Sequence, residues 1–213
     1  MDNLEEFHYF TTAVYAIKKP EFLSPIKQIT EEYLKRSRDN KKNKNPITVM
    51  TGDFSGEPLA AEFGQYISQT AWNILDSQGY AMDNFVTFFT EMWTQEHNFH
   101  SNMEQHMHGN GAQISAFYFL DVPENGCKMI VYDPRPAKVI INLPFKEKEE
   151  TTQASQNIMF SPEAGTLIFT PAWLPHSFTR NFNKNKPVRF VHMNLSVMPS
   201  PDKKEEKSSV EVI

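Results

Sequence analysis

After Tyr80 the hydrophobic positions fall into short segments rich in aromatic and β-branched residues, which is typical of β-strands. Turn sequences separate them, among them Gly109-Asn110-Gly111 and Pro162-Glu163-Ala164-Gly165. Many short strands at this spacing favour an antiparallel sandwich or jelly roll. The pattern predicts strands at residues 85–94, 104–108, 113–121, 128–133, 138–143, 157–160, 166–170 and 188–198.

The N-terminal third has a helical pattern instead. Ser24-Pro25 is a helix start, followed by apolar residues at helical spacing, and a second amphipathic stretch runs from about residue 57 to 77. Residues 10–17 predict a short strand. We therefore expect a mainly β fold whose N-terminal α-helices pack on one face of the sheets.

Length and composition narrow the class of protein. The 213 residues suffice for one globular domain, with a supporting region at 1–84, a β core at 85–198 and a disordered polar tail at 199–213. A net charge of −5 gives no electrostatic case for nucleic acid. The single cysteine, Cys127, excludes an intramolecular disulfide and predicts a small buried residue. The acidic N-terminus is no signal peptide, and no apolar run is long enough for a membrane span, so we expect a cytoplasmic protein.

The candidate chemistry lies in the histidines. His106 and His108 are two residues apart in a predicted strand, so their side chains project from the same face, and His176 begins a later strand. Imidazole is the commonest ligand for first-row metals. A His-x-His pair alone is a weak signal. It becomes specific when combined with the strand at 165–169, the turn that ends in His176, and Arg189 thirteen residues later. We interpret His97 and His100 as solvated loop residues, with metal binding as the alternative, and His192 as a structural residue or one that packs behind the metal ligands.

These residues carry a resemblance. The chain resembles the iron(II)- and 2-oxoglutarate-dependent oxygenase superfamily, and within it a bacterial and phage group with a His-x-His strand and a Trp-Leu-x-His turn. The likeness is nearly full length, although its weight rests on residues 93–198. The matching segments are Trp93, His106-Met107-His108, residues 115–120 and 132–136, residue 165 through His176, and Arg189.

The resemblance implies a double-stranded β-helix, the jelly-roll or cupin-like architecture, with iron(II) at one mouth. It also implies that Arg189 binds the distal carboxylate of 2-oxoglutarate, with Ser115 as a second donor. A planar guanidinium is well matched to a carboxylate. Phe119 occupies the position where many relatives have a tyrosine that helps bind the co-substrate, and Tyr118 points to the other face.

The metal ligands depart from the superfamily's usual set of two histidines and a carboxylate, because His108 occupies the carboxylate position. Three interpretations stay open. The first is a three-histidine site of His106, His108 and His176. In the second, a carboxylate such as Glu104 or Asp133 completes the set. In the third, only two residues bind the metal.

The expected function is hydroxylation of a peptide or small molecule, with succinate and CO2 as co-products. One alternative is a cupin-like metalloenzyme that does not use 2-oxoglutarate, and Arg189 distinguishes the two, since only the first needs it at the metal pocket. Another is a non-catalytic jelly-roll binding module, for which the three histidines would not converge. Jelly rolls often pair through strand edges, so a homodimer is compatible with the sequence. If the chain is phage-encoded, the expected compartment is the host cytoplasm.

Overall fold

The computed structural model describes residues 4–39, 47–147 and 150–201. Two long helices lie in the N-terminal third, α1 (Leu23–Asp39) and α2 (Ala61–Ser77). Short 3-10 turns occur at Pro20–Phe22, Pro58–Ala60, Met82–Asn84 and Pro136–Ile140. The strands are β1 (Tyr15–Lys18), β2 (Thr48–Met50), β3 (Phe85–His97), β4 (Met103–His106), β5 (Ile114–Asp121), β6 (Met129–Tyr132), β7 (Asn157–Phe160), β8 (Thr166–Pro171), β9 (His176–Phe178) and β10 (Val188–Pro199).

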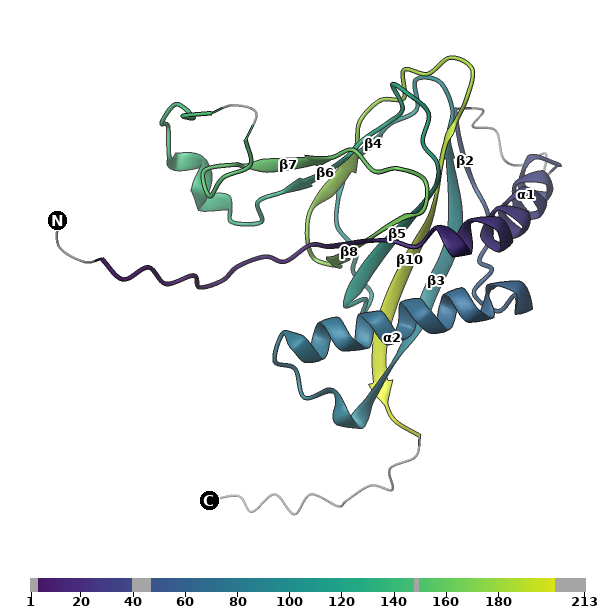
Figure 1. The fold of residues 1–213 in the computed structure, drawn as a ribbon, viewed down its shortest axis with the longest axis horizontal. Coiled ribbons are helices and arrows are strands. Elements are labelled where there is room, and N and C mark those ends of the chain that lie inside the picture. Colours follow the sequence, from purple (N-terminus) through teal and green to yellow (C-terminus); the bar gives the residue numbers. More distant parts are fainter. Residues whose placement is uncertain (1–3, 40–46, 148–149, 202–213) are drawn as a thin grey trace.

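The strands form two antiparallel sheets (Figure 1). The six-stranded major sheet has the order β1-β8-β5-β10-β3-β2, and the four-stranded minor sheet has the order β4-β9-β6-β7. From β3 to β10 the chain passes back and forth between the sheets, and among these described strands only β6 and β7 are consecutive strands of the same sheet, which is the arrangement of a double-stranded β-helix. The predicted jelly-roll fold with N-terminal helices is confirmed.

Two hydrophobic clusters occupy the two faces of the major sheet. One lies between the sheet and the helices, where Phe63 and Ile67 of α2 meet the outward-facing Met193 of β10. The other fills the space between the sheets and contains Phe117, Phe178 and Cys127. Because side chains alternate along a strand, β10 sends Val191, Met193 and Leu195 to the helices and Val188 and Phe190 to the interior.

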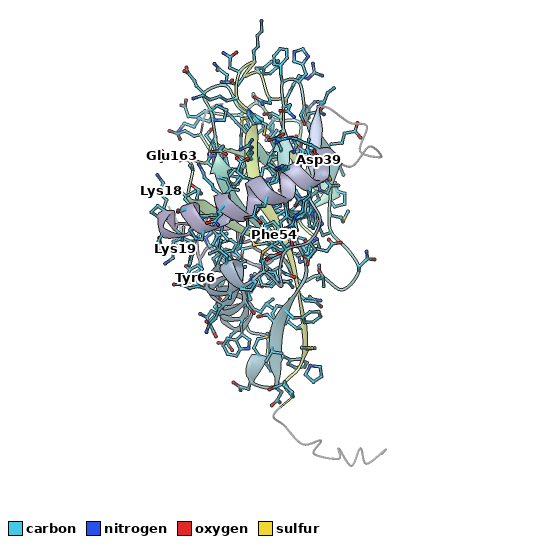
Figure 2. The ribbon with its side chains drawn as sticks, turned by 90° about the vertical axis from the view of Figure 1, so that its right-hand side faces the viewer. Lys18, Lys19, Asp39, Phe54, Tyr66 and Glu163 are labelled. Carbon is cyan, nitrogen blue, oxygen red and sulfur yellow. The ribbon has the colours of Figure 1, made fainter. Side chains whose placement is uncertain are left out.

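The N-terminal region is built into the major sheet. Its strands β1 and β2 form the two sheet edges, pairing with β8 and β3. Figure 2 shows α1 crossing the sheet, with Phe54 beneath it. Lys18 forms an ion pair with Glu163, and the Lys19 ammonium lies 4.4 Å from the centre of the Tyr66 ring of α2.

Most of the predicted elements are present, although β2 has no predicted counterpart and several bounds differ. The strand predicted at 138–143 is wrong, because Pro136 begins a 3-10 turn there and Lys138 is held by Asp133 and two main-chain oxygens. The first strand begins only at Tyr15, and β4 ends at His106, two residues before His108. Most of the predicted tail at 199–213 lies outside the described residues. None of the helices in the described ranges combines the length and apolar content that crossing a membrane requires.

Candidate metal centre

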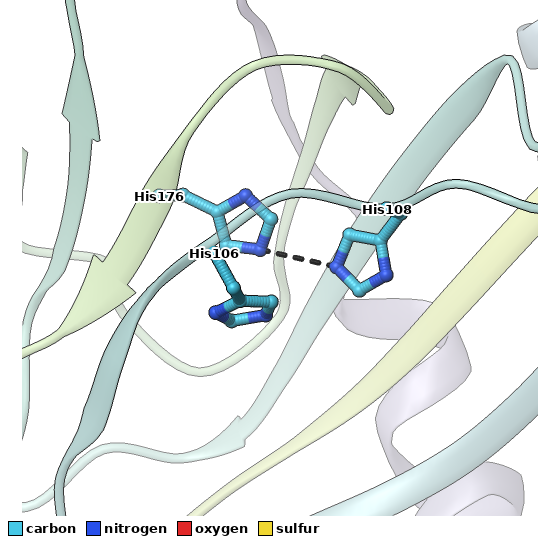
Figure 3. Close-up of side chains that lie close together, drawn as sticks. All are labelled: His106, His108 and His176. Carbon is cyan, nitrogen blue, oxygen red and sulfur yellow. Dashed lines mark hydrogen bonds between the residues drawn. The ribbon is translucent and has the colours of Figure 1, made fainter.

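His106, His108 and His176 come together at one end of the space between the two sheets (Figure 3). His106 on β4 lies directly opposite His176 on β9 in the strand register. His108 follows β4 and is held in place by its backbone N–H, which donates to the carbonyl oxygen of Ala172 at 2.9 Å. One ring nitrogen from each histidine lies within 4.8 Å of the other two. The convergence that the sequence predicts is therefore present.

Two of the rings are oriented by the main chain. His106 Nδ1 lies 2.8 Å from the carbonyl oxygen of Glu104, and His176 Nδ1 lies 3.0 Å from that of Leu174. A carbonyl oxygen only accepts, so both Nδ1 atoms carry the hydrogen and both Nε2 atoms present a lone pair. This is the tautomer that a histidine needs in order to bind a metal through Nε2.

Burial keeps two of the three histidines uncharged. It lowers the pKa of His108 to about 4, with a smaller effect from the neighbouring His106. It also lowers the pKa of His176 to about 4, although the hydrogen bond to Leu174 acts in the opposite direction. Both histidines are therefore neutral near pH 7, and neutral imidazole is the form that binds metals.

The three residues fit a metal ion in both chemistry and spacing. His108 Nε2 lies 3.2 Å from His176 Nε2. Two nitrogens bound at about 2.1 Å to one ion, at angles between about 90° and 109°, are roughly 3.0–3.4 Å apart. A neutral three-histidine set also leaves the full charge of a divalent ion available to attract anionic ligands.

The two candidate carboxylates do not join the cluster. Among the described residues, the grouped metal-binding side chains are the three histidines alone. Glu104 is exposed and contributes its main-chain oxygen to His106. Asp133 forms ion pairs with Arg135 and Lys138, whose hydrogen bonds and charges lower the pKa of its carboxyl group well below the usual range despite partial burial.

Arg189 is not brought to the histidines. Its side chain donates to Glu96 Oε2 at 2.8 Å and to Glu31 of α1 at 2.5 Å, and it lies 3.5 Å from Asp121. These partners place it on the helix side of the major sheet. Arg189 is also the only lysine or arginine in strands β3 to β10, all of which the structure describes. The space beside the metal centre is filled by the aromatic rings of Phe117, Phe178 and Phe190 instead.

Ser115 does face the interior, where its hydroxyl donates to Asn194 Oδ1 at 2.8 Å. Asn194 Nδ2 in turn lies 3.2 Å from His108 Nδ1, so Ser115 is two hydrogen bonds from a candidate ligand. Asn194 did not stand out in the sequence. Its position, an even number of residues from the interior-facing Phe190, was the available signal.

His192 also belongs to the site's surroundings. Its ring is 1% exposed, lies against His108 at 4.5 Å and stacks on Phe117 at 4.9 Å between centroids. Neither of its nitrogens has a hydrogen-bond partner in the described structure, and the buried Nε1 of Trp93 beside it has none either. By contrast, His97 is fully buried and hydrogen-bonded, so the interpretation of it as a solvated residue is wrong.

Comparison with known proteins identifies a matching family model. Residues 91–190 match the family model described as "Putative 2OG-Fe(II) oxygenase". The matched segment includes all three histidines and strands β4 to β9. The resemblance seen in the sequence is thereby confirmed. A search of the curated proteins finds no significant match.

Solved structures share the fold at low sequence identity. A prolyl-4-hydroxylase from Pseudomonas putida is 10% identical, with a TM-score of 0.57, and the alignment covers 87% of this chain and 94% of that one. HygX from Streptomyces hygroscopicus, solved with nickel and 2-oxoglutarate bound, is 13% identical, with a TM-score of 0.55 and coverages of 87% and 83%. A prolyl hydroxylase from Trichoplax adhaerens, solved with a peptide fragment, is 10% identical, with a TM-score of 0.54 and coverages of 86% and 84%.

Proposed function

We propose that this protein is an iron(II)- and 2-oxoglutarate-dependent dioxygenase that hydroxylates a peptide or small-molecule substrate. The observation that carries the proposal is the convergence of His106, His108 and His176 at one end of a double-stranded β-helix. The match of residues 91–190 to the oxygenase family model supports it. A non-catalytic binding module would give no reason for three histidines to share one point.

Each of the three histidines acts as a metal ligand in this function. His106 and His176, with Nδ1 fixed by main-chain oxygens, present Nε2 to the ion, and His108 completes the set. Three protein ligands leave positions open for co-substrate and dioxygen. When bound, iron(II) and 2-oxoglutarate together activate O2, so that 2-oxoglutarate becomes succinate and CO2 while one oxygen atom enters a substrate C–H bond.

Anaerobic titration of iron(II) and 2-oxoglutarate into metal-free protein tests the proposal. The expected result is a weak visible charge-transfer band that requires both additions and is lost in His176→Ala. His100→Asn is the matched control, because His100 is exposed and its positive φ of 69° suits asparagine. Failure of the wild-type protein to bind iron(II) would overturn the proposal.

The position of Arg189 favours a second candidate, a three-histidine metalloenzyme that does not use 2-oxoglutarate. The arginine expected to bind the co-substrate forms ion pairs beneath α1, and the interior positions of the core strands carry no other lysine or arginine. For this candidate, iron(II) binds without any band, and 2-oxoglutarate leaves the iron affinity unchanged. Isothermal titration of 2-oxoglutarate into the iron-loaded protein, kept anaerobic, separates the two functions.

A further inference from the structure

Asn194 is the central member of a hydrogen-bonded group behind His108. It lies on β10 between Glu91 of β3 and Ser115 of β5, its direct neighbours in the strand register. Its Nδ2 lies 3.1 Å from Glu91 Oε2 and 3.2 Å from His108 Nδ1, and its Oδ1 accepts from the Ser115 hydroxyl at 2.8 Å. Nothing in the metal site described above assigns a role to Asn194 or Glu91.

The chemistry of these partners fixes the orientation of the amide. A carboxylate only accepts hydrogen bonds, so the side of Asn194 that faces Glu91 must be the NH2 group. The same NH2 group faces His108 Nδ1, which must therefore act as an acceptor. A neutral imidazole with an accepting Nδ1 carries its hydrogen on Nε2.

This tautomer closes a hydrogen-bond chain within the metal-free site. The Nε2–H of His108 donates to His176 Nε2 at 3.2 Å, and that atom can accept because His176 Nδ1 donates to Leu174. His108 thus differs from its two neighbours. His106 and His176 present a lone pair at Nε2, whereas His108 presents a hydrogen at the atom that would bind the ion.

We propose that Asn194 is a positioning residue that selects the tautomer of His108, and that Glu91 restrains metal binding through it. Binding of an ion at His108 Nε2 requires that hydrogen to leave and one to be gained at Nδ1, so the imidazole stays neutral. Nδ1–H then needs an acceptor, which Asn194 supplies by turning its amide so that Oδ1 faces His108 and Nδ2 faces the Ser115 oxygen. After this turn Asn194 Oδ1 also faces the Glu91 carboxylate. Both groups are hydrogen-bond acceptors, so their repulsion disfavours the turned amide.

The direction in which Glu91→Gln changes the metal affinity distinguishes this arrangement from simple charge attraction. In Glu91→Gln the side-chain amide can donate to the turned Asn194, so the metal-binding tautomer is no longer disfavoured. We expect affinity for a divalent ion to rise about three- to tenfold, the equivalent of one modest hydrogen bond. Glu104→Gln is the matched control, because it removes an exposed carboxylate two residues from His106. Charge attraction alone predicts weaker binding in both variants.

The measurement is a titration of cobalt(II) in competition with a chromophoric chelator. Because the inference rests on the metal site of the proposed function, a second measurement is made on the metal-free protein. Long-range 1H–15N correlation spectra should show His108 as the Nε2–H tautomer in the wild-type protein and as the Nδ1–H tautomer in Asn194→Asp, whose carboxylate only accepts. Circular dichroism checks that this variant folds.

The outcomes are distinct. Higher cobalt affinity in Glu91→Gln but not in Glu104→Gln supports the inference, and equal or lower affinity in Glu91→Gln overturns it. An Nδ1–H tautomer of His108 in metal-free wild-type protein also overturns it. Absence of cobalt and iron binding in the wild-type protein would overturn the proposed function and the metal-linked role of Glu91. An Nε2–H tautomer in that protein that becomes Nδ1–H in Asn194→Asp would still show that Asn194 selects the tautomer.

Discussion

Arg189 donates from Nε to Glu96 Oε2 at 2.8 Å, on the side of the major sheet that faces α1. The Glu96 side chain is only 2% exposed and also accepts two hydrogen bonds of 2.6 Å from Arg38. Arg189 therefore connects β10 to β3 and, through Glu31, to α1. A side chain with these partners has a structural role in the described protein.

Replacement of Arg189 by methionine should accordingly reduce stability and leave ligand binding intact. Loss of two hydrogen bonds to carboxylates, one of them buried, should lower the free energy of unfolding by about 1–3 kcal/mol. Urea unfolding measures this, and calorimetric titration measures the affinity for metal and 2-oxoglutarate. Arg38→Met is the matched control, since it removes the other partner of Glu96. Loss of 2-oxoglutarate affinity in Arg189→Met with unchanged stability would restore the co-substrate role that the sequence suggests.

The stability of the metal-free protein should depend on pH through its buried histidines. Burial lowers the pKa of His97, His108 and His176 to about 4. In the unfolded chain these groups titrate near about 6.5, so below that pH the unfolded state binds more protons. Their contribution to stability is complete above pH 6.5 and is lost as the pH falls toward 4.

Urea unfolding at about pH 7, 6 and 5 tests this sign, with an expected loss of at most about 1.4 kcal/mol per pH unit for each histidine. Saturating zinc should steepen the dependence slightly and extend it to lower pH, because metal-bound His108 and His176 take up no protons while the unfolded chain still does. A free energy of unfolding that stays constant over this range would contradict the burial of these rings.

Substitutions of different histidines should differ in their effect on metal affinity. His176→Ala and His106→Ala each remove a proposed ligand. Each should therefore weaken cobalt binding by more than the roughly 10–100-fold typical of losing an outer partner. His97→Gln is the control, since His97 is buried but lies outside the three-histidine cluster. Equal affinities in all three variants would show that cobalt binds elsewhere.

The strand pattern predicted the fold well, because strands produce a recognisable pattern of apolar and β-branched residues in the sequence. The prediction that His106 and His176 lie close together required only that their two strands be neighbours in a sheet, as they are. Arg189 shows the limit of this reasoning. It is three residues from His192, and an odd offset in a strand puts two side chains on opposite faces, so only one of them can face the interior. Which one does is decided by the carboxylates Glu96 and Glu31, distant segments whose proximity no local pattern shows.

His192 gives the last prediction. Its neutral ring is fully enclosed by aromatic neighbours, and burial together with the neighbouring histidines lowers its pKa well below the usual value. A buried polar group without a partner costs about 1–3 kcal/mol, so His192→Leu, which removes both unpaired nitrogens, should raise the free energy of unfolding by roughly 1 kcal/mol.

His97→Leu is the matched control with the opposite sign. His97 is equally buried, but its Nδ1 lies 2.9 Å from Ser101 Oγ and its Nε2 lies 3.2 Å from Gln95 Oε1. Its removal takes one buried hydrogen bond each from Ser101 and Gln95 and should be destabilising. Urea unfolding and cobalt titration are measured on both variants. A more stable His192→Leu with weaker cobalt or 2-oxoglutarate binding would show that His192 is retained for the site at a cost in stability. A less stable His192→Leu would mean that its nitrogens have partners in solution.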